Sequence, residues 1–155
     1  MFKNDITIEQ LELACRHVEE MKNAGVTENL AIRTLELFAD IYANIQQNEI
    51  RSVHHVDHVK LWSRKAKNIR RAIPDGKPKD SFIVEHGTPR RAFAREVFAL
   101  YEKKKLNTRA MTILIQKKYK LAVITLDENK VLNKIARCEA YTTPEERWDA
   151  AGIKF

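Results

Sequence analysis

The chain has 155 residues, 44% of them hydrophobic, and a formal net charge of +7. This length suits about one domain with a core of its own, and no apolar stretch approaches the roughly 20 residues of a membrane-spanning helix, which argues against a membrane partner. The N-terminus lacks the layout of a secretory signal peptide, and the two cysteines, Cys15 and Cys138, form no CxxC motif, so we expect a reduced, cytoplasmic protein.

The first part of the chain, residues 1–50, predicts an acidic pair of helices. Thr7 and Gln10 have the spacing of a capping box, and apolar residues follow at helical intervals until Gly25 ends the helix. Thr27 is a candidate N-cap for the second helix. The turn between them resembles that of a helix-turn-helix, but the acidic second helix would repel phosphates, so we expect a plain antiparallel pair.

The central part, residues 51–120, predicts a basic amphipathic helix that begins at Lys60 and stops at Pro74. Apolar side chains from Trp62 onward form one stripe along this helix. A second stripe carries cations at positions i, i+4, i+7 and i+11, which are Lys60, Arg64, Lys67 and Arg71.

Short strands and capped helices follow. A strand is expected over residues 81–86, and Thr88 and Pro89 then open a helix that runs to about residue 104. Asn107 or Thr108 caps the next helix, which leads into a second strand over residues 121–125. Two more helices follow, the first opened by a capping box of Thr125 and Glu128 and the second by Thr143.

These elements predict a mainly α (α+β) fold, namely a helical domain with a small two-stranded β element. We expect a single domain over residues 1–155. Within it, residues 1–50 form the acidic helical pair, residues 51–120 the basic central segment, and residues 121–155 a strand and the C-terminal helices.

The charges are distributed unevenly over the same three segments. Residues 1–50 hold 4 Lys/Arg and 9 Asp/Glu, residues 51–120 hold 19 and 6, and residues 121–155 hold 5 and 6, so the net charges are −5, +13 and −1. A positive excess confined to one segment is typical of a surface that faces a polyanion. We therefore expect the central segment to bind nucleic acid, DNA or RNA, chiefly through the phosphate backbone.

The candidate phosphate contacts lie on two predicted helices of the central segment. Arginine suits phosphate because its guanidinium group presents several donors in a fixed fork. Arg91 and Arg95 are one helical turn apart and near a helix N-terminus, where the helix dipole also favours anions. The full set is Lys60, Arg64, Lys67, Arg70, Arg71, Arg90, Arg91 and Arg95.

Two other uses of the basic segment stay open. Its cations could pair with the acidic first two helices. They could also form the docking face of a protein-interaction module, an inhibitor or adaptor that binds an acidic protein partner. An anionic membrane surface fits less well, because the apolar stripe of the basic helix suits a core.

The stretch VEHGTP, residues 84–89, suggests catalysis, because a β-branched run ends there in Glu85 and His86. This stretch resembles the first strand of the ββα-metal nucleases of the HNH type. The resemblance implies that His86 is a general base and that Glu85 is a catalytic carboxylate and metal ligand. It also implies that Asn129 and Asn133, on one face of a later helix, complete the metal site. The alternative function is therefore a nuclease that depends on a divalent metal, Mg²⁺ or Mn²⁺.

A second group of metal-binding residue types precedes the basic helix. His54 and His58 are four residues apart, which is the spacing of helical zinc ligands, and His55 and Asp57 lie between them. Zinc is thus the alternative to Mg²⁺ or Mn²⁺ as a cofactor. The candidates for a distant ligand are Cys15, His17, His86 and Cys138. Without a metal, these histidines would add positive charge to a phosphate-binding surface when protonated near about pH 6.

Overall fold

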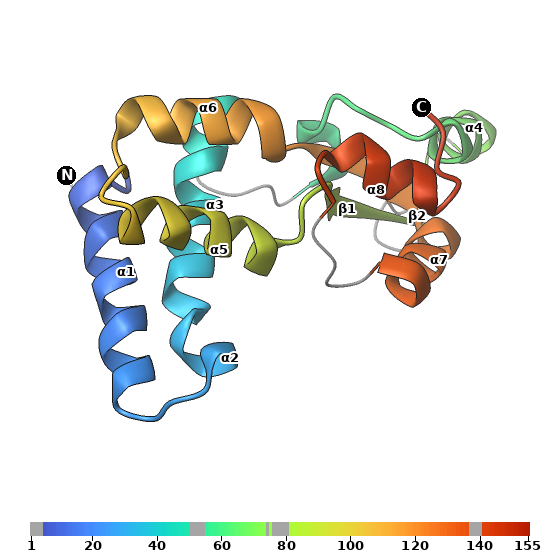
Figure 1. The fold of residues 1–155 in the computed structure, drawn as a ribbon. Coiled ribbons are helices and arrows are strands. Elements are labelled where there is room, and N and C mark those ends of the chain that lie inside the picture. The colour runs from blue at the N-terminus through green and yellow to red at the C-terminus, as the bar shows by residue number, and fades with distance from the viewer. Residues whose placement is uncertain (1–4, 50–54, 74, 76–80, 137–140) are drawn as a thin grey trace. The chain divides into compact units, whose positions relative to one another are not determined.

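The fold is mainly helical, with one small antiparallel sheet (Figure 1). The structure is a computed structural model that describes residues 5–49, 55–73, 75, 81–136 and 141–155. The predicted fold class, mainly α with a two-stranded β element, is confirmed. None of the helices in these residues is long and apolar enough to span a membrane.

The chain divides into two compact units, each built from two separate segments. The helical unit contains Met1–Ser52 and Arg90–Lys117, and the mixed unit contains Val53–Pro89 and Lys118–Phe155. The acidic first part of the sequence therefore shares a unit with the second half of the basic central segment. The expectation of one domain over the whole chain stays a prediction.

The helical unit is built from α-helices, and α3 has neighbours on several sides. Its helices are α1 (Ile8–Asn23), α2 (Glu28–Ala31), α3 (Arg33–Asn48), α5 (Arg90–Glu102) and α6 (Thr108–Lys118). α3 packs against both α1 and α5. Apolar side chains from these helices are fully or almost fully buried, among them Leu11, Val18, Leu35, Phe93 and Met111. Burial of these side chains is what stabilises the arrangement.

Local capping explains where several of these helices begin and end. The Thr7 hydroxyl accepts a hydrogen bond from the Gln10 N–H, and the Gln10 side chain accepts one from the Thr7 N–H, so the predicted capping box is confirmed. Gly25 follows α1 with a φ of +86°, a backbone conformation that favours glycine. The second predicted helix is in two parts, because Ile32 separates α2 from α3.

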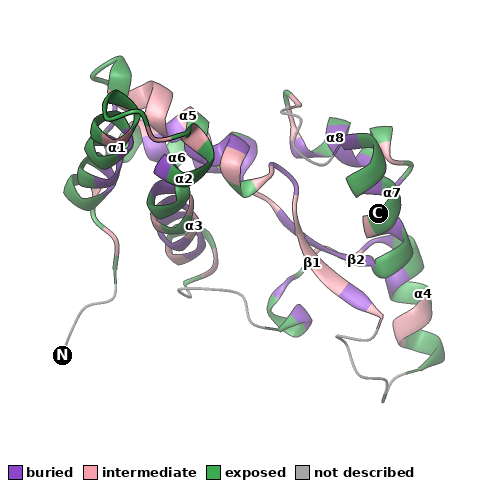
Figure 2. Ribbon diagram, turned by 90° about the horizontal axis from the view of Figure 1, so that it is seen from below, coloured by how far each residue is buried: buried purple, intermediate pink, exposed green. Residues whose placement is uncertain are grey.

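The mixed unit arranges its helices around the sheet. Its elements are the 3₁₀ helix η1 (Val56–His58), α4 (Arg64–Ala72), β1 (Phe82–His86), β2 (Leu121–Thr125), α7 (Leu126–Ala136) and α8 (Pro144–Ala150). β1 and β2 pair in antiparallel fashion, with Phe82 opposite Thr125 and His86 opposite Leu121. Figure 2 shows that β2 is buried along its length, whereas β1 is mostly half-buried.

The basic helix begins later than predicted, because a short extended segment before it pairs with the free edge of β2. The Val123 N–H donates to the Leu61 carbonyl at 2.8 Å, and the Ser63 N–H donates to the Val123 carbonyl at 2.9 Å. The Ser63 hydroxyl then accepts from the Ala66 N–H at 3.1 Å and caps α4. The expectation that this helix begins at Lys60 is therefore wrong, because Lys60 precedes the paired segment and α4 begins at Arg64.

A hydrophobic cluster holds β2, α7, α8 and the C-terminal residues together. Its buried members are Ala122, Ile124, Leu132, Ala136, Trp148 and Ile153. Gly87, directly after β1, approaches α8 so closely that a β-carbon there would lie 2.3 Å from Pro144 Cβ and 2.8 Å from the Trp148 ring. A side chain of any size at residue 87 would thus force α8 away from the sheet.

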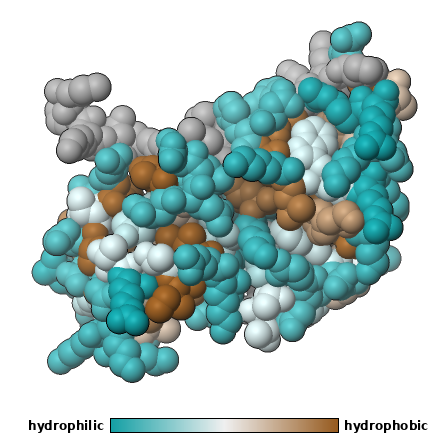
Figure 3. Space-filling view, turned by 90° about the horizontal axis from the view of Figure 1, so that it is seen from above, coloured by the Kyte–Doolittle hydropathy of each residue, from teal (hydrophilic) through white to brown (hydrophobic). Residues whose placement is uncertain are grey.

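Hydrophilic side chains cover most of the face drawn in Figure 3, and hydrophobic side chains show in separate patches. Among the residues that the structure describes, four large hydrophobic side chains have more than half of their surface exposed, namely Leu13, Leu30, Ile73 and Ile113. They lie on α1, on α2, at the end of α4 and on α6. Exposed hydrophobic surface therefore occurs in both units.

Candidate nucleic-acid interface

α4 presents exposed cations and no acidic side chain. Arg64, Lys65, Lys67 and Arg71 are exposed, and Lys60 is exposed in the segment that leads into the helix. Ala66 is fully buried, and α4 packs against β2. Between described residues, no ion pair uses Lys65, Lys67 or Arg71.

The mixed unit holds most of the excess positive charge. The helical unit has 13 Lys/Arg and 11 Asp/Glu, a net charge of +2, and the mixed unit has 15 and 10, a net charge of +5. Residues 60–73 alone contribute six cations and no carboxylate, so the rest of the mixed unit has 9 Lys/Arg against 10 Asp/Glu. The positive excess of this unit is thus confined to α4 and its approach.

Buried hydrogen bonds fix the start of α4. The Ser63 hydroxyl donates to Glu128 Oε2 at 2.7 Å, and the same oxygen accepts from the Thr125 N–H at 2.9 Å. The Thr125 hydroxyl accepts from the Glu128 N–H at 3.1 Å, which completes the predicted capping box of α7. Because Ser63 and Glu128 are both buried, one carboxylate holds the first turns of α4 and α7 at a defined spacing.

Two arginines of α4 have protein partners. Arg64 Nε donates to the Phe155 carbonyl at 3.0 Å, whereas two side chains engage the guanidinium of Arg70. Arg70 pairs with Asp57 at 3.2 Å and lies 5.7 Å from the centroid of the Trp62 ring. Trp62 is itself held, since its Nε1 donates to the Val59 carbonyl at 2.9 Å and its ring meets Phe82 edge-on at 5.3 Å. Arg70 thus has structural partners with which any bound phosphate must compete.

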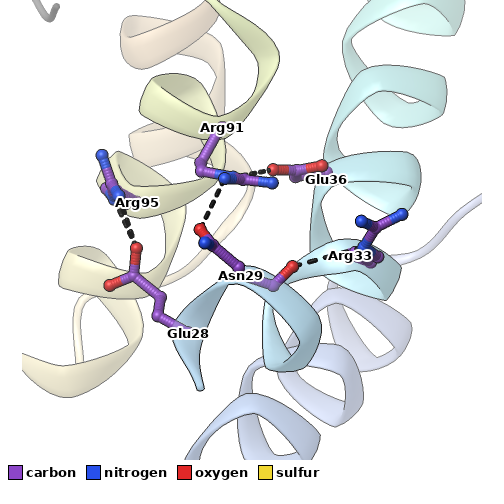
Figure 4. A network of polar contacts seen from close by, with 6 residues as sticks. All are labelled: Glu28, Asn29, Arg33, Glu36, Arg91 and Arg95. Atoms are coloured by element: carbon purple, nitrogen blue, oxygen red, sulfur yellow. Dashed lines mark hydrogen bonds and ion pairs between the residues drawn. The ribbon is translucent and has the colours of Figure 1, made fainter. Parts of the chain in front are cut away.

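Arg91 and Arg95 lie in the helical unit, where the acidic helices hold them (Figure 4). Arg91 Nε donates to Glu36 at 2.6 Å, and Arg91 Nη1 donates to the Asn29 side chain at 2.7 Å. Arg95 donates to Glu28 through Nε at 2.8 Å and Nη2 at 2.5 Å. The pairing of basic residues with the acidic helices, which the sequence left open, is present for these two arginines.

The eight candidate phosphate contacts are therefore divided between the two units. Five of them lie on or before α4 in the mixed unit. The other three lie on α5 in the helical unit, where Arg90 is exposed and the other two are paired. That these residues contact nucleic acid stays a prediction.

Glu85 and His86 end β1, and Glu85 is bound to a buried arginine. Arg147 Nη1 donates to Glu85 Oε1 at 2.8 Å and to the His86 carbonyl at 3.1 Å, while Arg147 Nε donates to the Ala136 carbonyl at 3.0 Å. The Arg147 side chain is 2% exposed, so this is a buried ion pair. The His86 ring lies edge-on to Tyr119 at 5.9 Å. Glu85 therefore has a structural role, and the catalytic roles of Glu85 and His86 stay predictions.

The residues suggested as metal ligands occupy different settings. Asn129 is half-buried and Asn133 is exposed, both on α7. Among the described residues, no three His, Cys, Asp or Glu side chains gather as ligands of one ion. His54 and Cys138 lie outside the described residues. His55 Nδ1 accepts from the Asp57 N–H at 3.2 Å, and its ring lies 6.3 Å from that of His58. The Mg²⁺, Mn²⁺ and zinc sites stay predictions.

Cys15, one of the residues considered for zinc, belongs to the core of the helical unit. Its side chain is fully buried in α1 and it is a free thiol. Burial, with a smaller effect of the Glu12 charge, raises the pKa of this thiol from 9.0 to about 12. A thiol that keeps its proton is a poor metal ligand, so Cys15 acts here as a small hydrophobic side chain.

From the sequence, no functional or structural role was assigned to three residues that matter here, namely Ser63, Lys65 and Arg147. Lys65 lies off the stripe of cations spaced at i, i+4 and i+7, although a count of all cations over residues 60–73 would have included it. The bond from Ser63 to Glu128 joins residues 65 positions apart, and the bond from Arg147 to Glu85 joins residues 62 apart. No local pattern indicates contacts over such separations.

Comparison with known proteins assigns no function to this surface. The chain matches no protein-family model, no curated protein and no solved structure. The surface is therefore characterised by its own chemistry: exposed cations on a helix whose first turn is fixed by buried hydrogen bonds.

Proposed function

We propose that this protein binds nucleic acid, DNA or RNA, through α4 and the segment that leads into it. The observation that supports the proposal is a group of exposed cations. Lys60 lies in the segment before α4, and Arg64, Lys65, Lys67 and Arg71 lie on α4, which has no acidic residue. Each phosphate that such a cation neutralises releases condensed counterions, and this release favours binding. The interaction is chiefly with the backbone, because Lys and Arg on an exposed helix face meet phosphates before base edges.

The spacing of the cations suits a phosphate backbone. Arg64, Lys67 and Arg71 lie at i, i+3 and i+7 and so share one face of α4. At 1.5 Å per residue these seven steps span about 10 Å. One strand of a duplex carries a phosphate for about every 3.4 Å of helix axis, so this face reaches about three phosphates.

The candidate contacts are not equivalent. Lys65, Lys67 and Arg71 are exposed and form the main contact surface. Arg64 is also exposed, but its Nε donates to the Phe155 carbonyl at 3.0 Å. Arg70 contributes less, because Asp57 and Trp62 already engage its guanidinium. Arg91 and Arg95 contribute least, because Glu36 and Glu28 neutralise them within the helical unit.

The test is the triple variant Arg64→Glu/Lys67→Glu/Arg71→Glu. Its affinity for short labelled single- and double-stranded DNA and RNA is measured by fluorescence anisotropy over a range of salt concentrations. We expect affinity to fall by about tenfold or more, and the dependence of log K on log salt to become shallower by about three units for duplex DNA.

A matched control separates a local contact from a general effect of charge. The variant Lys22→Glu/Lys130→Glu/Lys134→Glu changes the net charge equally, at exposed lysines outside α4 and the segment that leads into it. Screening at physiological salt confines charge effects to roughly 8 Å, so the control should lose less than about threefold in affinity. Equal losses in both triple variants, or a wild-type protein that binds none of the four nucleic acids, would contradict the proposal.

A further inference from the structure

A groove between α5 and α6 in the helical unit takes no part in the proposed function. It has a volume of about 300 Å³, and its walls are one face of each helix. The lining residues of α5 run from Glu96 to Lys103 and those of α6 from Ala110 to Lys117, in both cases at positions i, i+3, i+4 and i+7. Figure 1 shows the two helices running in opposite directions on either side of the turn that joins them.

The floor of this groove is apolar and partly open to solvent. It includes Leu100 from α5 and Ile113 and Leu114 from α6. Ile113 has 56% of its surface exposed, although its neighbour Met111 is fully buried in the core of the unit. Two apolar stripes that face each other across a groove are the feature that an amphipathic helix requires for docking.

The rim of the groove, defined here as the charged side chains of residues 96–117, is mostly basic. Residues 96–117 hold five cations and two carboxylates. All five cations are exposed, namely Lys103, Lys104, Lys105, Arg109 and Lys117. The charged residues that line the groove itself are Lys103 and Lys117, one on each helix, and one carboxylate, Glu96. A ligand that covers the apolar floor would therefore place its own flanks beside cations.

We propose that this groove binds an acidic amphipathic helix of a partner protein. The apolar stripe of that helix covers Ile113 and Leu114, and its carboxylates face Lys103 and Lys117. A nucleic-acid backbone matches the basic rim but leaves the apolar floor unused. A flat anionic membrane matches both but not the concave shape. The inference is independent of the proposed function, because the groove lies on α5 and α6 and the nucleic-acid surface lies on α4.

A residue in the turn between the two helices can be changed to lower the positive charge next to Lys103 without loss of the fold. Lys104 has a φ of +56°, and its N–H donates to the Tyr101 carbonyl at 2.9 Å. The Lys105 N–H donates to the Leu100 carbonyl at 2.9 Å, so the end of α5 is a Schellman motif in which glycine is the favoured residue at 104. Lys104→Gly thus removes a cation while it suits the backbone.

The experiment uses the full chain and a labelled synthetic peptide as a probe. The peptide is an amphipathic helix with leucines along one face and glutamates on both flanks. Two control peptides are the same sequence with lysine in place of glutamate and a permuted sequence in which the leucines no longer share a face. We expect the acidic amphipathic peptide to bind at least about tenfold more tightly than either control, because both apolar burial and charge contribute.

Three variants locate the site. Ile113→Asp should weaken binding of the acidic peptide by about tenfold or more, and Leu30→Asp is its matched control, since Leu30 is 59% exposed on α2 of the same unit. Lys103→Glu/Lys117→Glu should reverse the preference, so that the lysine peptide binds more tightly than the glutamate peptide. Lys104→Gly should weaken binding by about two- to fivefold while the melting temperature is maintained or raised.

Several outcomes would overturn the inference. One is equal binding of the acidic peptide and its permuted control. Another is binding that Ile113→Asp leaves unchanged or that Leu30→Asp weakens as much. Concentration-dependent self-association that Ile113→Asp abolishes would assign the groove to a second copy of this chain instead. Tighter binding to phosphatidylserine vesicles or to RNA than to the peptide, lost in the same variant, would assign it to those ligands.

Discussion

The hydroxyl of Ser63 donates a hydrogen bond of 2.7 Å to Oε2 of Glu128, and both side chains are buried. Ser63 is also the N-cap of α4, because its oxygen accepts from the Ala66 N–H. The basic helix that we propose as a nucleic-acid surface therefore takes its position from a carboxylate in a different segment of the mixed unit.

This relationship predicts the effect of removing the carboxylate. Glu128→Ala leaves the Ser63 hydroxyl and the Thr125 N–H without their buried acceptor, and we expect the free energy of unfolding to fall by about 2 kcal/mol. Glu128→Gln keeps an oxygen at the same place and should cost less, on the order of 1 kcal/mol. Urea unfolding of both variants measures this. Equal losses in the two variants would contradict the role given to the oxygen.

The ion pair between Glu85 and Arg147 predicts a large effect on stability. Glu85→Ala removes the carboxylate that balances an arginine with 2% exposure, and we expect a loss of about 3 kcal/mol in the free energy of unfolding. Chemical denaturation checks this value. A loss below the roughly 0.5 kcal/mol typical of surface substitutions would show that Arg147 does not depend on Glu85.

The same ion pair determines how the nuclease alternative should be tested. Loss of cleavage in a Glu85 variant would report unfolding as well as chemistry, so His86→Ala is the better variant. If the protein is a nuclease of the kind that VEHGTP suggests, cleavage of DNA or RNA requires Mg²⁺ or Mn²⁺ and disappears in His86→Ala at a temperature where the variant is folded. Cleavage that persists in this variant would refute the role of His86.

Gly87 predicts a steric effect. The β-carbon of Gly87→Ala would lie 2.3 Å from Pro144 Cβ, so α8 must move, and we expect a loss of about 2 kcal/mol or more in the free energy of unfolding. Pro144→Gly removes the nearest of the clashing atoms. The double variant Gly87→Ala/Pro144→Gly should therefore lose less stability than the two single variants combined. Additive losses, measured by thermal and urea unfolding, would mean that the clash is not the cause.

Cys15 predicts a dependence of stability on pH. Because burial raises the pKa of its thiol from 9.0 to about 12, the unfolded chain loses this proton above about pH 9 while the folded chain keeps it. The contribution is fully present below pH 9 and is lost as the pH rises from there toward 12. At pH 10 the loss amounts to about 1 kcal/mol.

The measurement compares urea unfolding of the wild type and Cys15→Ala from about pH 8 to pH 10. Cys15→Ala lowers stability at every pH because it leaves a small cavity, but it should also remove the additional alkaline loss. Titration of the remaining lysines and tyrosines affects both proteins alike. Parallel curves for the two proteins would contradict a thiol that stays protonated in the folded state.

Local signals in the sequence predicted most of the secondary structure. The capping boxes at Thr7 and Thr125 form as expected, and β2 covers residues 121–125 as expected, because these features depend on residues within a few positions of one another. The start of the basic helix was predicted wrongly, because it depends on residues that are far apart in the sequence. Residues 61–63 pair with Val123 of β2, and this distant pairing overrides a helical pattern of side chains.

The candidate sites were harder to predict, because their residues meet across long separations. The sequence suggested in general that basic residues could pair with the acidic helices, but it gave no reason to choose Arg91 and Arg95 over Arg64 and Arg71. That choice follows from the packing of α5 against α3, which places Arg91 within 2.6 Å of Glu36. Likewise, the sequence suggested a catalytic role for Glu85, because it follows a β-branched run. The ion pair of Glu85 with Arg147 could not be predicted, because the two residues are 62 positions apart.

The division of each unit into two segments has a consequence for synthesis on the ribosome. The helical unit needs Met1–Ser52 and Arg90–Lys117, so α1 to α3 emerge long before the helix whose arginines pair with Glu28 and Glu36. The first half of the mixed unit is then made before β2 and Glu128 exist. A single cut between Pro89 and Arg90 would leave both units divided between the two fragments. The helical unit is complete in the nascent chain before the mixed unit.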